Sequence, residues 1–290
     1  MPMTLVKGTY RVVGASPDGD SVRFYADDPS VWAAAGIVVR TNAAGGVQLR
    51  LDAIDSLETH YTPPHATSPW RQPSDLGDGA AEALLQLLGF RNVVRDDAGT
   101  VTSATPDRTP GYILTRFADK YGRAVALAYP GGRPGRARDG SQVYVDVAEM
   151  RRSVNHRLLQ AGWVYPTFYA MLYVDLRDDL AATAVAARAQ KAGVWARDVT
   201  LEGFRLSSRT QLMDDLVILP KLFRRLAEYL ALDETGTVSL AGFPAFLAAY
   251  GDRLFTVPAG QATSFDTLVE RRGQRLRLTI PPEQIVFLEG

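Results

Sequence analysis

The sequence of 290 residues contains no cysteine, which excludes disulfide bonds and thiolate metal sites. It also lacks an excess of either charge, because 32 Lys and Arg residues balance 32 Asp and Glu residues. A surplus of positive charge is the usual electrostatic sign of non-specific nucleic-acid binding, so composition alone does not point to a nucleic-acid partner. No run of about 20 apolar residues is present, and no membrane partner is therefore expected.

A secretory signal is also missing. Residues 1–7 contain no apolar segment and no small-residue cleavage site, so a cytoplasmic location is expected. What is present is an ordinary globular composition, 46% hydrophobic and 22% charged, which allows a sizeable core. A length of 290 residues exceeds the usual size of one domain and predicts either two domains or one domain with large additions.

Short strands are predicted to dominate the first half of the chain. β-Branched and aromatic residues alternate with polar ones over residues 5–13 and 21–26, and further strands are predicted over 36–40, 47–54, 112–117 and 124–129. Helices are predicted over residues 80–88, 143–161 and 178–192, and each is followed by a glycine. This order predicts a β-rich α+β fold, namely a five-stranded OB-fold-type barrel with packed helices.

The pattern changes after about residue 200. A helical apolar stripe over residues 212–230 is interrupted by Pro220, a short helix is predicted over 243–250, and β-structure over 256–287. We therefore predict one domain over residues 1–199 and a smaller α+β accessory domain over residues 200–290.

Three charged clusters lie at predicted turns and strand ends. Residues 18–22 read Asp-Gly-Asp-Ser-Val, residues 50–58 read Arg-Leu-Asp-Ala-Ile-Asp-Ser-Leu-Glu, and residues 119–123 read Asp-Lys-Tyr-Gly-Arg. Each cluster alone is typical of a turn or strand end with solvated charges. Together they offer carboxylates for a hard divalent cation and for orienting a water molecule, and arginines that bind a phosphate bidentately. This combination suits metal-assisted phosphodiester hydrolysis.

In order and content, these clusters resemble three motifs of the staphylococcal nuclease (thermonuclease) family. Those motifs are Asp-Gly-Asp-Thr-Val, Arg-Leu-x-x-Val/Ile-Asp-Thr-Pro-Glu and Asp-Lys-Tyr-Gly-Arg. Two later segments resemble the family as well: residues 154–162, with Val-Asn, two leucines and a glycine, and residues 190–195, Gln-Lys-Ala-Gly-Val-Trp. Any one motif is weak evidence, but five in the same order cover about residues 5–198.

The resemblance implies a calcium-dependent nuclease that hydrolyses the phosphodiester bonds of DNA or RNA. Asp20 and Asp55 would bind Ca²⁺ with the backbone carbonyl of Ser56, and Asp18 would support these ligands without touching the metal. Glu58 would act as the general base or orient the attacking water.

The resemblance also implies how substrate would bind. Arg50 and Arg123 would bind the phosphate from opposite sides and stabilise its developing charge, while Lys120 and Tyr121 would contact a neighbouring phosphate. The substrate is expected to be single-stranded or frayed. Aromatic residues over 162–169 either stack on its bases or belong to the core.

Some features depart from the family pattern. Leu57 replaces the proline of the second motif and is expected to loosen the turn before Glu58. Residues 27–46, 61–79 and 91–110 are expanded and are expected to shape the substrate groove. The alternative function is a catalytically weak or inactive module of the same family that binds nucleic acid or protein. Residues 200–290 match no motif and are expected to serve interaction or regulation, through self-association or a protein partner.

Overall fold

A computed structural model describes residues 1–132, 137–233 and 235–288. The chain forms two compact units. The first contains residues 1–54 and 80–158, and the second contains residues 55–79 and 159–290. This division differs from the predicted one at residue 199, because residues 55–79 and 159–199 belong to the same unit as the C-terminal segment.

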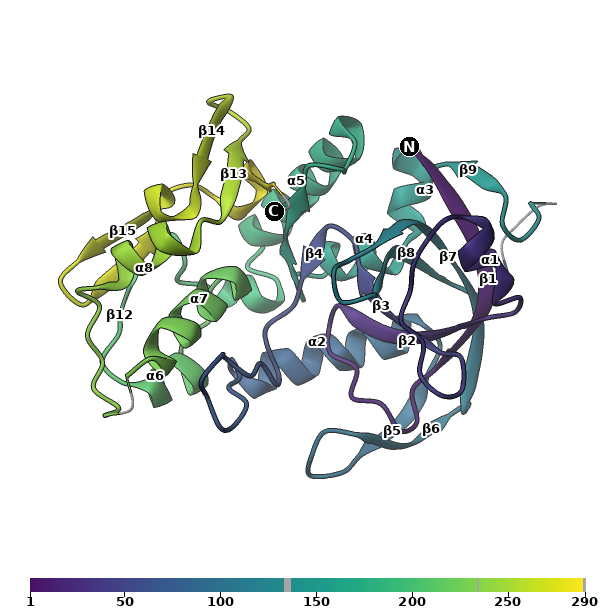
Figure 1. Cartoon of the computed structure of the whole chain (residues 1–290), viewed down its shortest axis with the longest axis horizontal. Helices are drawn as coiled ribbons and strands as arrows, with labels where there is room; N and C mark the ends of the chain where they lie inside the picture. Colours follow the sequence, from purple (N-terminus) through teal and green to yellow (C-terminus); the bar gives the residue numbers. More distant parts are fainter. Residues whose placement is uncertain (133–136, 234, 289–290) are drawn as a thin grey trace. The chain divides into compact units, whose positions relative to one another are not determined.

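The first unit is built on a closed five-stranded mixed β-barrel (Figure 1). The barrel strands, in spatial order, are β1 (Pro2–Arg11), β2 (Ser21–Ala26), β3 (Val47–Leu51), β8 (Ala124–Pro130) and β7 (Arg108–Ala118). The β3–β8 pair is parallel, the other pairs are antiparallel, and β7 returns to β1 to close the barrel. Closure matters because it removes the unpaired edges of these strands.

The sequence alternation explains which side chains fill the barrel. Val22 and Phe24 of β2 face Leu49 and Val47 of β3 in register, and all four side chains are buried. Their strand neighbours are mostly half-exposed, as expected for strands with one face on a core. A Cβ atom at Gly8 of β1 would lie 2.1 Å from a backbone oxygen, so the close approach of β1 to β2 requires glycine there.

Several other elements surround the barrel or lead out of it. Within the first unit they are α1 (Ser30–Ala34), the hairpin of β5 (Arg91–Arg95) and β6 (Val101–Thr105), β9 (Gln142–Tyr144) beside β1, and α3 (Val147–Arg152). Three elements contain the boundary between the units: β4 (Ile54–Asp55), α2 (Ser74–Leu87) and α4 (Val154–Gln160).

The predicted strands are confirmed except over residues 36–40. That segment is not a strand, because Gly36 adopts a left-handed φ of 68° after α1 and the Arg40 N–H bonds the carbonyl of Gly122, which lies in a turn. The expanded segment 91–110 is also more regular than expected, since it contains the β5–β6 hairpin and the start of β7.

The predicted helix over 143–161 is wrong as a single element. It consists of β9, α3 and α4, with a break at Ser153, whose extended backbone ends α3. The Ser153 hydroxyl donates to the Met150 carbonyl and accepts the N–H of His156, so it both closes one helix and begins the next. Pro220, predicted to interrupt a helix, instead stands at the start of one, where its missing N–H has no helical partner to lose.

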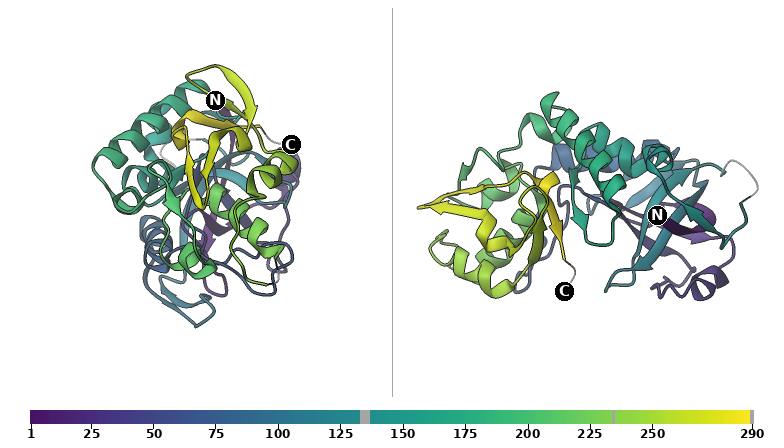
Figure 2. Two further views of the ribbon diagram at one scale, coloured as in Figure 1. Left: turned by 90° about the vertical axis from the view of Figure 1, so that its left-hand side faces the viewer. Right: turned by 90° about the horizontal axis from the view of Figure 1, so that it is seen from above.

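The second unit combines helices with two small sheets (Figure 2). Its α-helices are α5 (Val174–Ala189), α6 (Arg209–Asp214), α7 (Pro220–Ala231) and α8 (Phe243–Tyr250). One sheet has the order β11 (Phe168–Tyr169), β17 (Ile285–Phe287), β13 (Arg253–Thr256) and β14 (Gln261–Ser264). The other has the order β12 (Phe204–Arg205), β16 (Arg275–Leu278) and β15 (Val269–Arg272). The remaining elements are β10 (Tyr165–Pro166) and three 3₁₀ turns over Gly193–Ala196, Phe265–Leu268 and Pro282–Gln284.

One hydrophobic core joins early and late parts of the chain in the second unit. Leu57 and Trp70 belong to the same buried cluster as Leu222 and Phe223 of α7 and Phe287 of β17. Burial of side chains of this size stabilises by about 1.5–3 kcal/mol each. Residues 55–79 therefore depend on the C-terminal segment for much of their packing.

Candidate functional site

The predicted site residues are distributed over both units. Asp18, Asp20, Arg50 and residues 120–123 belong to the barrel unit, whereas residues 55–58 belong to the second unit. Each set has a local geometry that can be followed from the sequence.

The turn before β2 places Asp20 beside β3. The Asp18 carboxylate accepts a hydrogen bond from the Asp20 N–H at 3.3 Å, which is the local bond expected of aspartate in a turn. The Asp20 carbonyl accepts the N–H of Leu51 at 2.8 Å. Asp18 thus orders the backbone that carries Asp20.

The strand register places Arg50 between Asp20 and Arg123. Arg50 pairs with Ser21 on β2 and with Val125 on β8. Neighbouring strands are about 4.8 Å apart, so Asp20, Arg50 and Arg123 arise from three adjacent backbone segments.

The turn between β7 and β8 is organised by Asp119. Its carboxylate accepts the backbone N–H groups of Tyr121 and Arg123, both at 3.0 Å, and the Arg123 Nε at 2.7 Å. Gly122 takes a left-handed φ of 78°, which the turn requires. The Lys120 and Arg123 side chains lie 5.3 and 5.6 Å from the ring centroid of exposed Tyr121. The hairpin therefore presents two cations and an aromatic face together.

A pocket of about 730 Å³ lies beside this turn, within the barrel unit. Its lining includes residues 36–40 on one side and residues 116–122, with Lys120 and Tyr121, on the other. The exposed Arg40 and the partly exposed Arg116 add two cations that the motifs do not contain. The volume falls within the range of about 300–1,000 Å³ that is typical of small-ligand sites.

In the second unit, the segment after β3 holds its carboxylates near or below the surface. Asp55 and Ser56 are 3% and 4% exposed, and Leu57 is fully buried in the core. The Glu58 N–H donates to the Gln72 side-chain oxygen at 3.2 Å, and the Gln72 amide nitrogen donates to the Ile218 carbonyl at 2.8 Å. Leu57 was expected to loosen the turn, but its burial and Gln72 together anchor the backbone at Glu58.

Residues 58–72 form a loop that is closed at its base. The Glu58 carbonyl accepts the Gln72 N–H at 2.7 Å, and Tyr61 and Trp70 exchange two backbone hydrogen bonds of 2.8 and 2.6 Å. Much of the expansion over residues 61–79 is therefore this loop and the beginning of α2, which starts at Ser74, six residues before the predicted helix.

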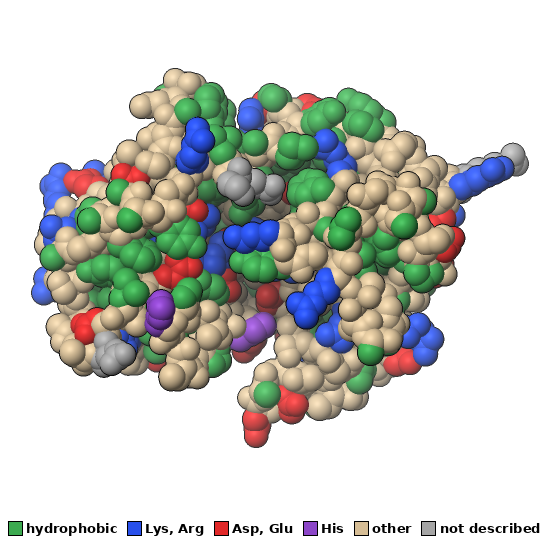
Figure 3. Space-filling model, viewed as in Figure 1, with side chains coloured by type: hydrophobic (Ala, Val, Ile, Leu, Met, Phe, Trp, Pro, Cys, Tyr) green, Lys and Arg blue, Asp and Glu red, His purple; other side chains and the backbone are tan. Residues whose placement is uncertain are grey.

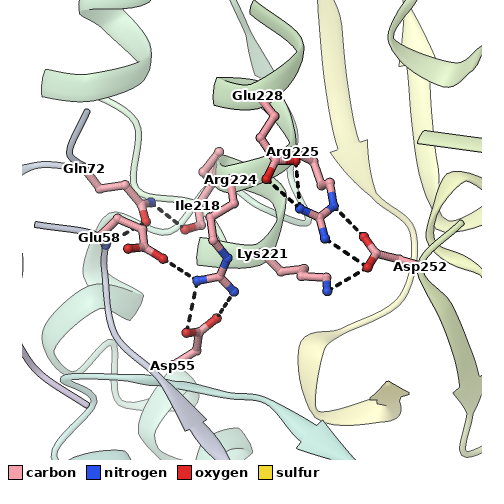
Figure 4. Close-up of polar contacts among 9 residues, drawn as sticks. All are labelled: Asp55, Glu58, Gln72, Ile218, Lys221, Arg224, Arg225, Glu228 and Asp252. Carbon is pink, nitrogen blue, oxygen red and sulfur yellow. Dashed lines mark hydrogen bonds and ion pairs between the residues drawn. The ribbon is translucent and has the colours of Figure 1, made fainter. Parts of the chain in front are cut away.

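A third arginine contacts the predicted metal ligand Asp55 and the predicted general base Glu58 (Figure 4). Arg224 of α7 donates to the two oxygens of Asp55 at 2.7 and 3.3 Å, and to one oxygen of Glu58. The Arg224 and Glu58 side chains are 18% and 19% exposed, and that of Asp55 is 4% exposed. Three carboxylate oxygens thus converge on one guanidinium group.

The electrostatics of Arg224 follow from this arrangement. Burial disfavours its charged form, but attraction to Asp55 and Glu58 and the hydrogen bonds to both outweigh burial and raise the pKa of Arg224 well above its usual value. Two carboxylates and one guanidinium leave a formal charge of −1. The group is therefore a permanent ion cluster with residual negative charge.

The same face of α7 carries a second ion cluster (Figure 4). Arg225 bonds Asp252 through Nε at 2.5 Å and Glu228 through Nη1 at 2.8 Å, and Lys221 bonds Asp252 at 2.9 Å. Burial, followed by repulsion from Arg225, lowers the pKa of Lys221 to about 8 despite its pairing with Asp252. Glu228 also accepts the hydroxyl of Tyr61, so α7 contacts the 58–72 loop at a second point.

Part of the aromatic segment belongs to the core. Tyr165 and Phe168 are fully buried, and the Tyr165 hydroxyl donates to Asp198 at 2.8 Å. Burial, followed by the charge of Asp198, raises the pKa of Tyr165 well above its usual value. Of the two roles left open for residues 162–169, core packing therefore applies to these two rings.

The donor set fits a hard divalent cation in charge and atom type, because the Asp55 and Glu58 oxygens already converge on a cationic group. Across residues 1–132, 137–233 and 235–288, no three or more His, Cys, Asp or Glu side chains are grouped to hold a metal ion. The predicted calcium site uses two carboxylates, Asp20 and Asp55, and thus does not depend on such a group. On the face drawn in Figure 3, basic side chains stand among acidic ones, as the balanced composition predicts.

The motifs did not reveal Arg224, Gln72 or Arg40. Arg224 lies 166 residues after Glu58, and no local pattern links them. Gln72 lies in a segment that is rich in Pro, Ser, Gly and Asp, and Arg40 lies in a segment that is predicted to be a strand. Among these residues, only the basic character of Arg40, close to an expanded loop, offered any signal in the sequence.

Comparison with known proteins identifies no relative: the chain matches no protein-family model and no curated protein. Within the described part of the chain, every helix is too short or too polar to cross a membrane.

Proposed function

We propose that this protein is a calcium-dependent nuclease with an OB-fold-type barrel, and that it hydrolyses phosphodiester bonds of DNA or RNA. One observation carries the proposal: the barrel register brings Asp20, Arg50 and Arg123 onto adjacent backbone segments, as a phosphate clamp beside a metal ligand requires. The motif resemblance supports the same reading.

In this proposal each residue has a defined task. Asp20 and Asp55, with the Ser56 carbonyl, hold the cation, which would polarise the phosphate. Glu58 orients the attacking water and accepts its proton. Arg50 and Arg123 bind the phosphate oxygens and stabilise the charge that develops on them.

Lys120 and Tyr121 contact the next phosphate of a single-stranded or frayed substrate. They stand at the pocket beside the β7–β8 turn, where Arg40 and Arg116 add positive charge. This local concentration of cations supports phosphate binding in a chain whose formal net charge is zero.

The test is cleavage of single-stranded DNA, duplex DNA and RNA with millimolar Ca²⁺ and with a chelator. Glu58→Gln and Arg123→Ala should each lower the Ca²⁺-dependent rate by about 10²–10⁴-fold, since each removes a proton acceptor or a charge stabiliser. Arg108→Ala is the matched control, because Arg108 pairs with Arg11 near the other end of β7. Circular dichroism verifies the fold of every variant.

A second candidate is favoured by the Arg224 contacts. A guanidinium group on Asp55 and Glu58 is also what a catalytically weak or inactive binding module would tolerate. Binding of nucleic acid by the folded protein, without any cleavage in millimolar Ca²⁺, would establish this candidate and refute the nuclease.

A further inference from the structure

The Asp55–Glu58 pair is held together by a side chain of the C-terminal segment. Both oxygens of Asp55 and one of Glu58 bind the Arg224 guanidinium. Two carboxylates this close repel each other when ionised, so each needs a cation nearby to remain charged at neutral pH. Arg224 supplies that cation from within the chain.

We propose that Arg224 occupies the cation position beside Asp55 and Glu58, and that a divalent cation binds Asp55 only by displacing the guanidinium. The proposal rests on the proposed function in that it concerns the same carboxylates. It adds that residues 200–290 regulate the site, through an internal competitor for the metal.

The balance of charge supports displacement. The three groups carry −1 with Arg224 in place, whereas a divalent cation would neutralise both carboxylates. Ca²⁺ takes oxygen donors, and both Asp55 oxygens that it could use are bonded by Arg224. One set of oxygens cannot satisfy both cations at full strength.

The backbone around Asp55 and Glu58 is anchored, so the competition between Arg224 and a cation concerns side chains. The Glu58 backbone is fixed by Gln72, and Leu57 is buried in the core, so the segment stays in place when the guanidinium leaves. Arg224 is held on α7, whose neighbouring Arg225 binds Asp252 and Glu228 instead.

The experiment measures cation binding directly, by calorimetry with Ca²⁺ and by Tb³⁺ luminescence, on the full-length protein without substrate. Arg224→Met keeps the length of the side chain and removes its charge. We expect it to bind Ca²⁺ at least about tenfold more tightly than the unaltered protein, and Asp55→Asn in the same chain should abolish the gain. The Ca²⁺ affinity of Arg224→Lys should lie between those of Arg224→Met and the unaltered protein. Lysine keeps the charge but lacks the planar group that bonds both carboxylates.

Arg188→Met is the matched control. Arg188 of α5 forms a comparable, partly buried ion pair with Glu283 in the same unit, and neither residue is one of the predicted site residues. It should lower thermal stability as Arg224→Met does, yet leave Ca²⁺ affinity unchanged. In Arg224→Met, the rise in melting temperature on adding Ca²⁺ should exceed that of the unaltered protein.

Unchanged or weaker Ca²⁺ binding in folded Arg224→Met and Arg224→Lys would overturn the proposal and make Arg224 a structural partner of the loop. Nuclease activity is a separate measurement. Tighter cation binding without cleavage in any variant would refute the proposed function and keep this inference. Cleavage by the unaltered protein with unchanged affinity in Arg224→Met would do the reverse.

Discussion

Arg40 illustrates how one residue of an expanded segment can join a binding surface. Its backbone N–H bonds the Gly122 carbonyl at 2.8 Å, so the segment is fixed to the turn that carries Lys120 and Tyr121. Its exposed side chain lines the same pocket. None of the five resembling motifs contains it.

Arg40→Ala should raise the KM for nucleic acid about three- to tenfold and leave kcat nearly unchanged, because a single phosphate contact binds ground state and transition state alike. It should also reduce the salt dependence of binding by about one charge. Steady-state kinetics at several salt concentrations check this. A lowered kcat with an unchanged KM would place Arg40 with the reacting phosphate instead.

At the scale of elements, α7 buries two chemically different faces. Leu222, Phe223 and Leu226 enter the hydrophobic core. The face with Lys221, Arg224, Arg225 and Glu228 follows the i, i+3, i+4, i+7 spacing and is also buried or nearly so. In sequence, such a charged face is typical of a solvated surface. Here carboxylates from other segments surround it, and no local pattern could have shown this.

Lys221 makes the stability of the second unit depend on pH. Its pKa is about 8 when folded, below the ordinary value of 10.5 that it regains on unfolding. Between about pH 8 and 10.5 the unfolded chain holds more protons, so the free energy of unfolding should rise with pH in that window. The full rise is at most about 3 kcal/mol, at 1.36 kcal/mol for each unit.

The half-buried Tyr61 and the buried Tyr165 act in the opposite sense at higher pH. The pKa values of Tyr61 and Tyr165 are raised, chiefly by burial, so the unfolded chain loses their protons first above about pH 10, and stability should then fall. Urea unfolding from pH 7 to 11 measures both effects. Lys221→Met should remove the rise and keep the fall, and a flat profile for the unaltered protein up to pH 10 would contradict the assignment.

At the scale of the whole molecule, the C-terminal segment shares a core with the residues that carry Asp55 and Glu58. Leu57 and Trp70 pack in one cluster with residues of α7 and β17. The predicted boundary at residue 199 would cut through this core. Residues 200–290 are therefore an integral part of the second unit.

A chain ending at residue 199 should lose the order of residues 55–79, since Leu57 and Trp70 lose their buried partners, each loss amounting to about 1.5–3 kcal/mol. Limited proteolysis should cut within this segment, and Ca²⁺-dependent cleavage should disappear. The mass of the fragments and the activity of the truncated chain give the readout. A truncated chain that resists protease there and cleaves nucleic acid would show that the C-terminal segment is dispensable.

Local features of the sequence determined many of the strands and turns of this protein. Residue patterns predicted the barrel strands, glycines marked several turns, and the motif resemblance predicts Asp20, Arg50 and Arg123 as site residues, which stays a prediction. Those features depend on neighbours within a few residues, and so they can be predicted from the sequence. Tertiary structure alone decided that Arg224 would bond Asp55 and Glu58 and that Leu57 would enter a core with α7, because these contacts join residues more than 160 positions apart. Burial and ion pairing act between residues that the fold brings together. When those residues lie far apart in the sequence, no local pattern predicts the contact.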